Sequence, residues 1–173
     1  MTPKGLSMTR TYSDIVYNIL PTQLGEVLLA ANSQGLVGIW FLDQAHFPDT
    51  TDWQRVREHR VLREAHGQLQ EYLDGLRQTF ELPLAFATGT PFQQRVWQAL
   101  VAIPYGKTTS YGQIASRVGS PTAVRAVGAA VGRNPLSMVV PCHRVLGAAG
   151  ALTGYAGGLE RKKALLSLEA AHT

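Results

Sequence analysis

The single cysteine of the chain, Cys142, is the first candidate for chemistry. It lies in Met138–Val145, an apolar run, and His143 follows it directly. The thiolate is the reactive form of cysteine, and a histidine can accept the thiol proton. Because adjacent side chains point in different directions in a strand or a helix, we expect a bridging water rather than a direct bond between the two residues. The alternative is a small buried hydrophobic residue, which is the usual role of a lone cysteine.

Glu169 is the third candidate. The pattern of residues 159–170 predicts a helix, in which Glu169 falls about 40° from Leu165 and about 60° from Leu166 at about 100° per residue. The carboxylate therefore lies on the apolar face, where it must find a partner or carry a large penalty. A histidine ring nitrogen would satisfy it. The alternative is a frayed terminal glutamate that is exposed to water.

Capping signals predict short helices in the second half of the chain. Thr90–Gln93 combine an N-cap threonine, a proline at the first helical position and a glutamine three residues after the cap, which predicts a helix to about Ile103. Ser110–Gln113 form another capping box, and the helix that they open ends at Gly119. The helix that ends at Gly119 and the helix that follows it form a helix-turn-helix pattern. This pattern is weak evidence for DNA binding on its own.

The third predicted helix begins at Ser120-Pro121, runs to about Gly132 and has a nearly bare surface. Its valines are expected to face the core: Val124, Val127 and Val131. Small residues cover the other sides: Ala126, Gly128, Ala129 and Ala130. Arg125 is the one long side chain beside them. Because glycine in a helix costs about 1 kcal/mol relative to alanine, the two glycines indicate close approach of another backbone, either a neighbouring helix or a nucleic-acid groove.

The charge distribution favours a polyanionic partner. The 173 residues carry a net charge of +4, but residues 1–90 carry −3 and residues 91–173 carry +7. No acidic residue lies between Glu81 and Glu160, and six basic residues fall in that gap: Arg95, Lys107, Arg117, Arg125, Arg133 and Arg144. Such a segment suggests a surface that faces nucleic acid, although chance on a basic protein is an alternative. The composition is that of a globular protein, without a transmembrane span, an export signal or a disulfide, so we expect a cytoplasmic protein.

The first half of the chain has a different pattern. Residues 11–43 predict three strands in an antiparallel meander, and residues 43–52 predict a loop. Residues 53–75 have helical spacing, with Leu62, Leu69 and Leu73 on one side. Residues 82–86 are a candidate for one more strand.

The sequence resembles the O6-alkylguanine-DNA alkyltransferase family over about residues 90–169. The motifs that carry the resemblance are Thr90-Pro-Phe-Gln, Val96-Trp, Ile103-Pro-Tyr-Gly-Lys-Thr-Thr-Ser-Tyr111, Ala123-Val-Arg-Ala-Val-Gly128, Asn134-Pro, Pro141-Cys-His-Arg-Val145 and Gly154-Tyr-Ala-Gly-Gly-Leu159. The Pro-Cys-His-Arg signature in this context is highly specific. The N-terminal half resembles the family only in length and strand pattern.

The resemblance implies an α/β fold of the α+β kind. A ribonuclease-H-like domain with an antiparallel sheet would span residues 1–88, and a helical domain with a winged helix-turn-helix would span residues 89–173. The family's recognition helix enters the minor groove of double-stranded DNA, and the damaged nucleotide is flipped out.

The resemblance also assigns roles to individual residues. Cys142 takes the alkyl group from O6-alkylguanine, and from O4-alkylthymine, while His143 and Glu169 form a water-bridged relay to the thiol and Arg125 replaces the flipped base in the stack. Asn134 and Tyr111 complete the catalytic set. The implied DNA contacts are Arg125, Tyr111, Ala126, Ala129, Arg133 and Ser110. The implied substrate pocket consists of Pro141, Val145, Tyr155, Ala156 and Gly157.

The implied reaction uses each protein molecule once. A thioether is not hydrolysed under mild conditions, and no second cysteine could take the group, so a single-turnover methyltransferase is expected. No cofactor is expected, and no metal either, because the cysteines that hold zinc in some relatives are absent and His59 and His66 lie seven residues apart. Ala156 stands where some relatives have serine, which leaves the range of alkyl groups open. We expect a monomer, with clustering on DNA left open.

Two other classes of function remain at this point. A non-enzymatic binder of alkylated DNA or a helix-turn-helix regulator would need neither Cys142 nor Glu169. A thiol hydrolase would use Cys142, His143 and Glu169, but it would need an oxyanion hole and would turn over many times.

Overall fold

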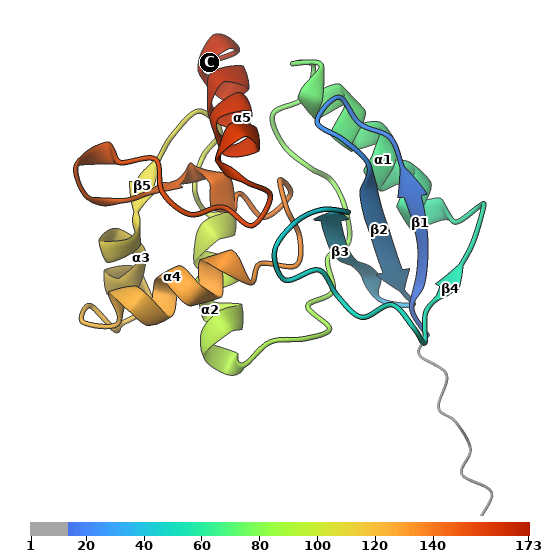
Figure 1. The fold of residues 1–173 in the computed structure, drawn as a ribbon, viewed down its shortest axis with the longest axis horizontal. Coiled ribbons are helices and arrows are strands. Elements are labelled where there is room, and N and C mark those ends of the chain that lie inside the picture. The colour runs from blue at the N-terminus through green and yellow to red at the C-terminus, as the bar shows by residue number, and fades with distance from the viewer. Residues whose placement is uncertain (1–13) are drawn as a thin grey trace, which may run out of the picture.

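The computed structural model describes residues 14–173, which form two parts packed side by side (Figure 1). A sheet and the helix α1 (Arg60–Leu73) make up the N-terminal part, and helices with short turns make up the C-terminal part. The last helix, α5 (Leu159–Ala171), returns to the N-terminal part, where Gln78 Nε2 donates to the carbonyl of His172 at 2.8 Å. The predicted mixed α+β fold is confirmed.

The sheet has the strand order β3-β2-β1-β4. β1 (Val16–Leu20), β2 (Val27–Asn32) and β3 (Gly35–Phe41) are antiparallel, as predicted. The short β4 (Gln54–Arg55) pairs in parallel with β1. Helix α1 packs against this sheet.

Side chains of β2 alternate between two cores, as expected for a strand that is buried on both faces. Val27, Leu29 and Ala31 enter the main core, whereas Leu28 and Ala30 enter a smaller core with Trp40. Gly38 makes room for that ring, because a Cβ built there would lie 1.8 Å from the Trp40 side chain. The sheet is therefore covered on one face by α1 and on the other by aromatic side chains.

Two predictions for the first half were wrong in detail. The helix expected over residues 53–75 begins only at Arg60, because the residues before it are extended and pair with β1. Val56 N donates to Tyr17 O at 2.9 Å, which fixes that extended segment. Residues 82–86 form no full strand, and a single bridge joins Leu84 to Leu36 of β3.

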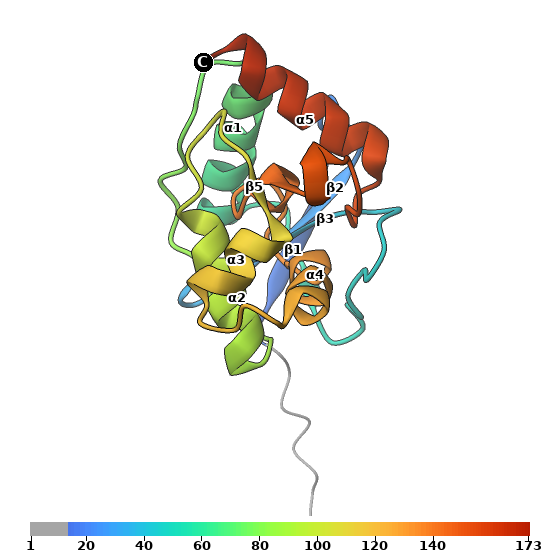
Figure 2. The same ribbon diagram turned by 90° about the vertical axis from the view of Figure 1, so that its left-hand side faces the viewer.

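The C-terminal part contains four helices and one pair of short parallel strands in the described residues. Their bounds are α2 (Pro91–Val101), β5 (Thr109–Ser110), α3 (Tyr111–Arg117), α4 (Val124–Gly132), β6 (Val145–Leu146) and α5. Both predicted capping boxes are present: Thr90 with Gln93 at α2, and Ser110 with Gln113 at α3. Figure 2 shows α3 in front of α2 and α4 beside them, with all three helices in front of the sheet.

The third predicted helix starts later than expected. Helix α4 begins at Val124 after an N-cap, Ala123, that makes no side-chain cap bond, and Pro121 lies in a turn. Ser120 N donates to Ala115 O at 2.9 Å and so continues the end of α3 instead of opening α4. Val124 consequently lies at the exposed start of the helix with 41% of its surface accessible, so its predicted place in the core was wrong.

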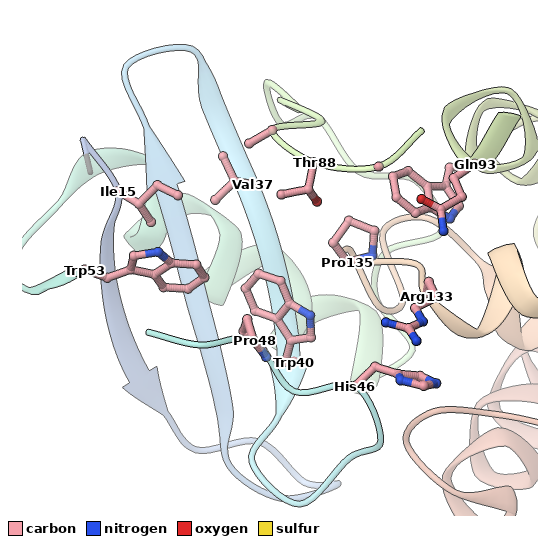
Figure 3. A pocket seen from close by; sticks show the side chains of 13 residues that line it. Ile15, Val37, Trp40, His46, Pro48, Trp53, Thr88, Gln93, Arg133 and Pro135 are labelled. Atoms are coloured by element: carbon pink, nitrogen blue, oxygen red, sulfur yellow. The ribbon is translucent and has the colours of Figure 1, made fainter. Parts of the chain in front are cut away.

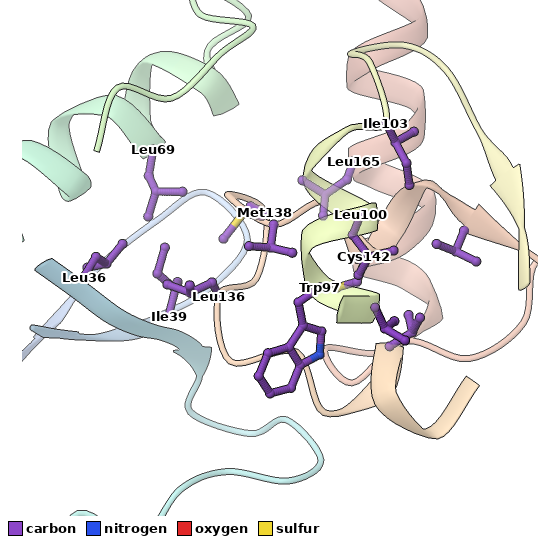
Figure 4. Close-up of a cluster of buried hydrophobic side chains, with 14 of the residues drawn as sticks. Leu36, Ile39, Leu69, Trp97, Leu100, Ile103, Leu136, Met138, Cys142 and Leu165 are labelled. Atoms are coloured by element: carbon purple, nitrogen blue, oxygen red, sulfur yellow. The ribbon is translucent and has the colours of Figure 1, made fainter. Parts of the chain in front are cut away.

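One hydrophobic core joins the two parts (Figure 4). Leu36 and Ile39 of β3 and Leu69 of α1 belong to the same cluster as Leu100 of α2 and Leu165 of α5. Met138 and Leu136 lie between them, on the segment that leads to Cys142. Because this segment is packed on both sides, the cysteine is held rigidly against both parts.

Candidate active site

Cys142 begins a short 3-10 turn, Cys142–Arg144, at the end of a tightly folded loop. Asn134 holds this loop: its Oδ1 accepts from Leu136 N at 3.0 Å, and its Nδ2 donates to Val140 O at 2.8 Å. Cys142 N donates to the same carbonyl at 2.8 Å. The Asn134 amide therefore fixes the backbone from which the thiol projects.

The structure brings His143 and Glu169 together. His143 Nε2 lies 2.9 Å from Glu169 Oε1, and both side chains are almost completely buried. Because the carboxylate only accepts, Nε2 carries the hydrogen in neutral His143 and Nδ1 is the basic nitrogen. Nδ1 is buried and has no hydrogen-bond partner among the described residues. This geometry suits the bridging water that we expected between His143 and the thiol.

The Glu169 carboxylate is the centre of a buried network. Arg144 Nη2 donates to Oε1 at 2.6 Å, and Arg144 Nε lies 3.0 Å from both oxygens. Gly106 N donates to Oε2 at 3.3 Å. Burial acts to raise the pKa of Glu169, but hydrogen bonds from His143 and Arg144 outweigh it and lower the pKa to about 2. The carboxylate is thus charged at neutral pH and can stabilise an imidazolium.

Two members of this network were not predicted. Tyr72 of α1 donates its hydroxyl to Glu169 Oε1 at 2.7 Å and lies 3.2 Å from His143 Nε2, so the N-terminal part completes the relay. A tyrosine on the apolar face of a helix needs a partner for its hydroxyl, and this was the available signal. Arg144 was counted as part of a surface facing nucleic acid, which is wrong, because it is 6% exposed and paired with Glu169.

The thiol of Cys142 is neutral at rest. Burial raises its pKa, and a hydrogen bond with Asn134 and the positive charge of Lys162 compensate only partly. Burial also lowers the pKa of His143, although Glu169 opposes this effect. The site therefore holds an uncharged thiol beside an uncharged base, so the proton has to move during the reaction.

Lys162 is a buried residue that the sequence reasoning missed. Its ammonium donates to the carbonyls of Val145 at 2.6 Å, Thr153 at 2.7 Å and Gly154 at 3.0 Å. It lies on the same face of α5 as Leu165 and Glu169, at helical spacing, which was the signal for its burial. The lysine fixes the loop of residues 145–154 and places a positive charge near the thiol.

A pocket of about 220 Å³ lies over Cys142. It is lined by Ala45, His46, Tyr111, Gly128, Val131, Gly132, Cys142, Gly154, Tyr155 and Ala156. Tyr155 and Ala156 thus lie where they were expected. The other three expected residues are not among its lining: Pro141 lines a different pocket, Val145 is buried in β6, and Gly157 packs against Phe41.

Tyr111 and Ser110 lie at the start of α3. The Tyr111 hydroxyl donates to Thr153 O at 3.1 Å, and burial raises the pKa of Tyr111, so the phenol stays a donor over the pocket. The Ser110 hydroxyl accepts from Gln113 N at 3.1 Å, which is its cap role. Ser110 is half-buried, so only part of its surface is accessible to a partner.

Helix α4 presents a bare surface beside the pocket. Arg125, Ala126 and Ala129 are exposed on it, and Arg133 follows at its end. A Cβ at Gly132 would meet no atom within 4 Å. Packing inside the protein therefore does not explain this glycine, and the nucleic-acid alternative remains. Gly128 and Gly132 also line the pocket, so this helix borders both the pocket and the solvent.

Two further findings concern metal and membrane. Across residues 14–173, histidine, cysteine, aspartate and glutamate side chains form no group of three or more that could hold a metal ion. His66 Nε2 instead lies 3.0 Å from Pro21 O. Of the helices in the same range, none is both long and apolar enough to cross a bilayer.

The fold and the site define a protein with a buried thiol, histidine and carboxylate under a small pocket, next to a helix-turn-helix. Residues 91–171 match the family model described as the 6-O-methylguanine DNA methyltransferase DNA-binding domain, and residues 15–86 match the ribonuclease-like domain of the same family.

Curated relatives agree. The methylated-DNA–protein-cysteine methyltransferase of Mycobacterium tuberculosis is 46% identical over 155 residues, which is 90% of this chain and 92% of that protein. The constitutive enzyme of Bacillus subtilis is 50% identical over 153 residues, which is 87% of this chain and 92% of that protein. A crystal structure of the M. tuberculosis protein OGT in complex with DNA has a TM-score of 0.84 and 44% identity, covering 91% of this chain and 94% of that one. The chain belongs to the methylated-DNA–protein-cysteine methyltransferase family.

Proposed function

We propose that the protein repairs alkylated DNA by transferring the alkyl group of O6-alkylguanine to Cys142. The observation that carries this proposal is the position of the thiol at a pocket bordered by α4, with the His143–Glu169 relay behind it. O4-alkylthymine, which also carries its alkyl group on an exocyclic oxygen of the base, is a second substrate of the same chemistry.

The proposed reaction is one displacement. The thiol proton passes through a bridging water to Nδ1 of His143, and the sulfur attacks the alkyl carbon in line with O6. The S–C bond forms as the C–O6 bond breaks, and the electron pair of that bond leaves with guanine. The departing guanine is then protonated, so the thiol proton leaves with it and the protein keeps a neutral thioether.

Ionisation of the thiol supplies only part of the rate. A thiol with the ordinary pKa of about 8.5 is roughly 3% ionised at pH 7. Complete ionisation of such a thiol would therefore accelerate the reaction only about 30-fold, or by about 2 kcal/mol. In Cys142, whose pKa is raised by burial, the relay must first offset the cost of ionising the thiol. Positioning of the sulfur in the Asn134 loop adds to this. So does hydrogen-bond donation to the leaving guanine from the Tyr111 hydroxyl, once this hydroxyl turns from the Thr153 carbonyl to the base.

The pocket can receive the base only outside the duplex. We infer that α4 lies in the minor groove, with its exposed alanines against the DNA, and that the damaged nucleotide is flipped out of the duplex into the pocket. Arg125 would then fill the gap in the stack, since its planar guanidinium can lie between bases. Arg133 would contact the backbone from the end of the same helix.

The test is the intact mass of the protein after reaction with duplex DNA that contains O6-methylguanine. The parent protein should gain the mass of one methylene group. Cys142→Ser should gain nothing but should bind the DNA with nearly unchanged affinity. Binding by the parent without any mass change would leave a non-enzymatic damage binder as the function, and repeated turnover would indicate a hydrolase.

A further inference from the structure

A second cavity, of about 280 Å³, opens between the outer face of the sheet and the start of α2 (Figure 3). Its lining includes the aromatic residues Trp40, Trp53 and Trp97, the prolines Pro48 and Pro135, and the polar side chains of His46, Thr88, Gln93 and Arg133. The rings of Trp40 and Trp53 have centroids 5.7 Å apart. No acidic residue lines this cavity, which we call the tryptophan pocket.

The tryptophan pocket adjoins the pocket over Cys142. His46 lines both pockets. At the end of α4, Gly132 lines the pocket over Cys142 and the next residue, Arg133, lines the tryptophan pocket. His46 is exposed and has a φ of 60°, a left-handed conformation that side chains rarely adopt. It is thus the side chain on the boundary between the two spaces, and Figure 3 shows it near Arg133.

The loop that carries His46 is anchored on both sides. Ala45 N donates to Ala156 O at 3.0 Å, across to the C-terminal part. The buried Gln44 side chain accepts from Phe41 N at 2.9 Å and donates to Ala45 O at 3.2 Å. The backbone at the boundary between the two pockets is therefore held on both sides. A strained backbone at such a position is typical of a ligand site.

The lining determines the chemistry of an occupant. Two indole rings favour an uncharged aromatic group, which they contact by offset or edge-to-face packing. The absence of acidic residues disfavours a cation. Because the space over Cys142 has to hold the guanine itself, a large O6 substituent must extend out of it, and the tryptophan pocket is the adjoining apolar space.

We propose that the tryptophan pocket is a second subsite of this protein, which holds the distal aryl ring of O6-aralkyl groups that are too long for the space over Cys142. The inference rests on the proposed alkyl transfer and adds a second subsite to it. The reaction is unchanged: the S–CH₂ bond forms, the CH₂–O6 bond breaks, and guanine leaves with the proton that the thiol released. The aryl ring stays in the tryptophan pocket as part of the thioether on Cys142.

The experiment compares two free bases, O6-benzylguanine and O6-(4-phenylbenzyl)guanine, so that DNA binding plays no part. The single-turnover rate with each is followed by intact mass, and the measured quantity is the ratio of the phenylbenzyl rate to the benzyl rate. Trp53→Ala removes one wall of the pocket, and Thr88→Trp fills it from an exposed position without removing any packing. Phe47→Ala is the matched control, an exposed aromatic residue on the same loop as His46 that lines neither pocket.

The ratio should fall about tenfold in Trp53→Ala, the order expected from the loss of one aromatic partner. It should fall at least as far in Thr88→Trp, because the new indole occupies the space of the distal ring. It should stay at the parent value in Phe47→Ala. An equal ratio in all four proteins, or no reaction of the parent with the phenylbenzyl base, would overturn the subsite while leaving benzyl transfer intact. Failure of the parent to react even with O6-methylguanine in duplex DNA would instead refute the proposed function.

Discussion

The hydroxyl of Tyr72 links the two parts of the molecule at the level of single atoms. It is the only contact in the described network that reaches Glu169 from the N-terminal sheet and helix α1. The hydroxyl donates to a charged oxygen in a dry interior, where such hydrogen bonds are strong. We therefore expect it to influence both stability and the relay.

Tyr72→Phe should lower the free energy of unfolding by about 1.5–3 kcal/mol, the usual contribution of a buried hydrogen bond to a charged group. It should also slow methyl transfer several-fold, because His143 loses one of its two neighbours at Nε2. Tyr105→Phe is the matched control, since the Tyr105 hydroxyl is buried near the same ring cluster and has no partner among the described residues. Equal effects in both variants would show that the Tyr72 hydroxyl only fills space.

Glu169 should make the stability of the folded protein depend on pH in the acidic range. Its pKa is lowered to about 2 in the folded protein, below its ordinary value. A lowered carboxyl pKa contributes stability that is present above the unfolded pKa and is lost as the pH falls toward the folded pKa. The melting temperature should therefore decline between about pH 4.5 and about pH 2, and less steeply in Glu169→Gln. Parallel declines in the two proteins would mean that other carboxyl groups govern the acid transition.

At the scale of elements, helix α4 carries the proposed groove contact. Arg125 is exposed at its first turn beside Ala126 and Ala129. The helix has no acidic residue to repel a phosphate and few side chains to hinder a backbone. Its position next to the pocket allows one element both to bind DNA and to border the flipped base.

Arg125→Ala should slow repair strongly in duplex DNA, where flipping a paired base costs a few kcal/mol. Reaction with free O6-benzylguanine should stay near the parent rate, because nothing has to be flipped. Arg125→Lys should restore little, since an ammonium cannot stack between bases. An equal loss on duplex and free base would place Arg125 in the chemistry or the fold, and full rescue by lysine would make it a phosphate contact.

Elements were predictable from the sequence where caps or periodicity acted locally. The starts of α2 and α3 follow from their capping boxes, and Glu169 follows from its place on the apolar face of α5. The start of α4 was wrong because Ser120-Pro121 has a capping composition but completes the end of α3. Tyr72 and Arg144 could not be assigned, because their partner Glu169 is distant in the chain from both. Only the folded structure brings α1 and the turn Cys142–Arg144 to the Glu169 carboxylate on α5.

At the scale of the whole molecule, the exposed positive charge lies on the C-terminal part, on and around the helix-turn-helix. Burial removes Arg144 and Lys162 from the charge available to DNA. The basic residues that remain exposed between α2 and the end of α4 are Arg95, Lys107, Arg117, Arg125 and Arg133. The N-terminal part, which carries the acidic excess, instead supplies a wall of the pocket and a partner for the relay. The border between the domains at residues 88 and 89 stays a prediction.

DNA affinity should fall steeply as salt rises, because each neutralised phosphate releases counterions. With about four or five phosphate contacts, the slope of log K against log salt concentration should be about −4. Arg133→Ala should make that slope shallower by about one unit. Lys163→Ala on α5 is the control, and it should leave the slope unchanged. A flat salt dependence in the parent would mean that the charge asymmetry serves another purpose.

The central claim is a single, irreversible alkyl transfer to Cys142, and stoichiometry tests it most directly. Protein is mixed with a large excess of duplex DNA whose O6-methylguanine carries an isotopic label in the methyl group, and labelled protein is counted until no further change occurs. We predict a plateau at about one methyl group per protein molecule, with all of the label in the peptide that contains Cys142. Continued loss of methyl groups beyond that plateau, or label on another residue, would contradict the account.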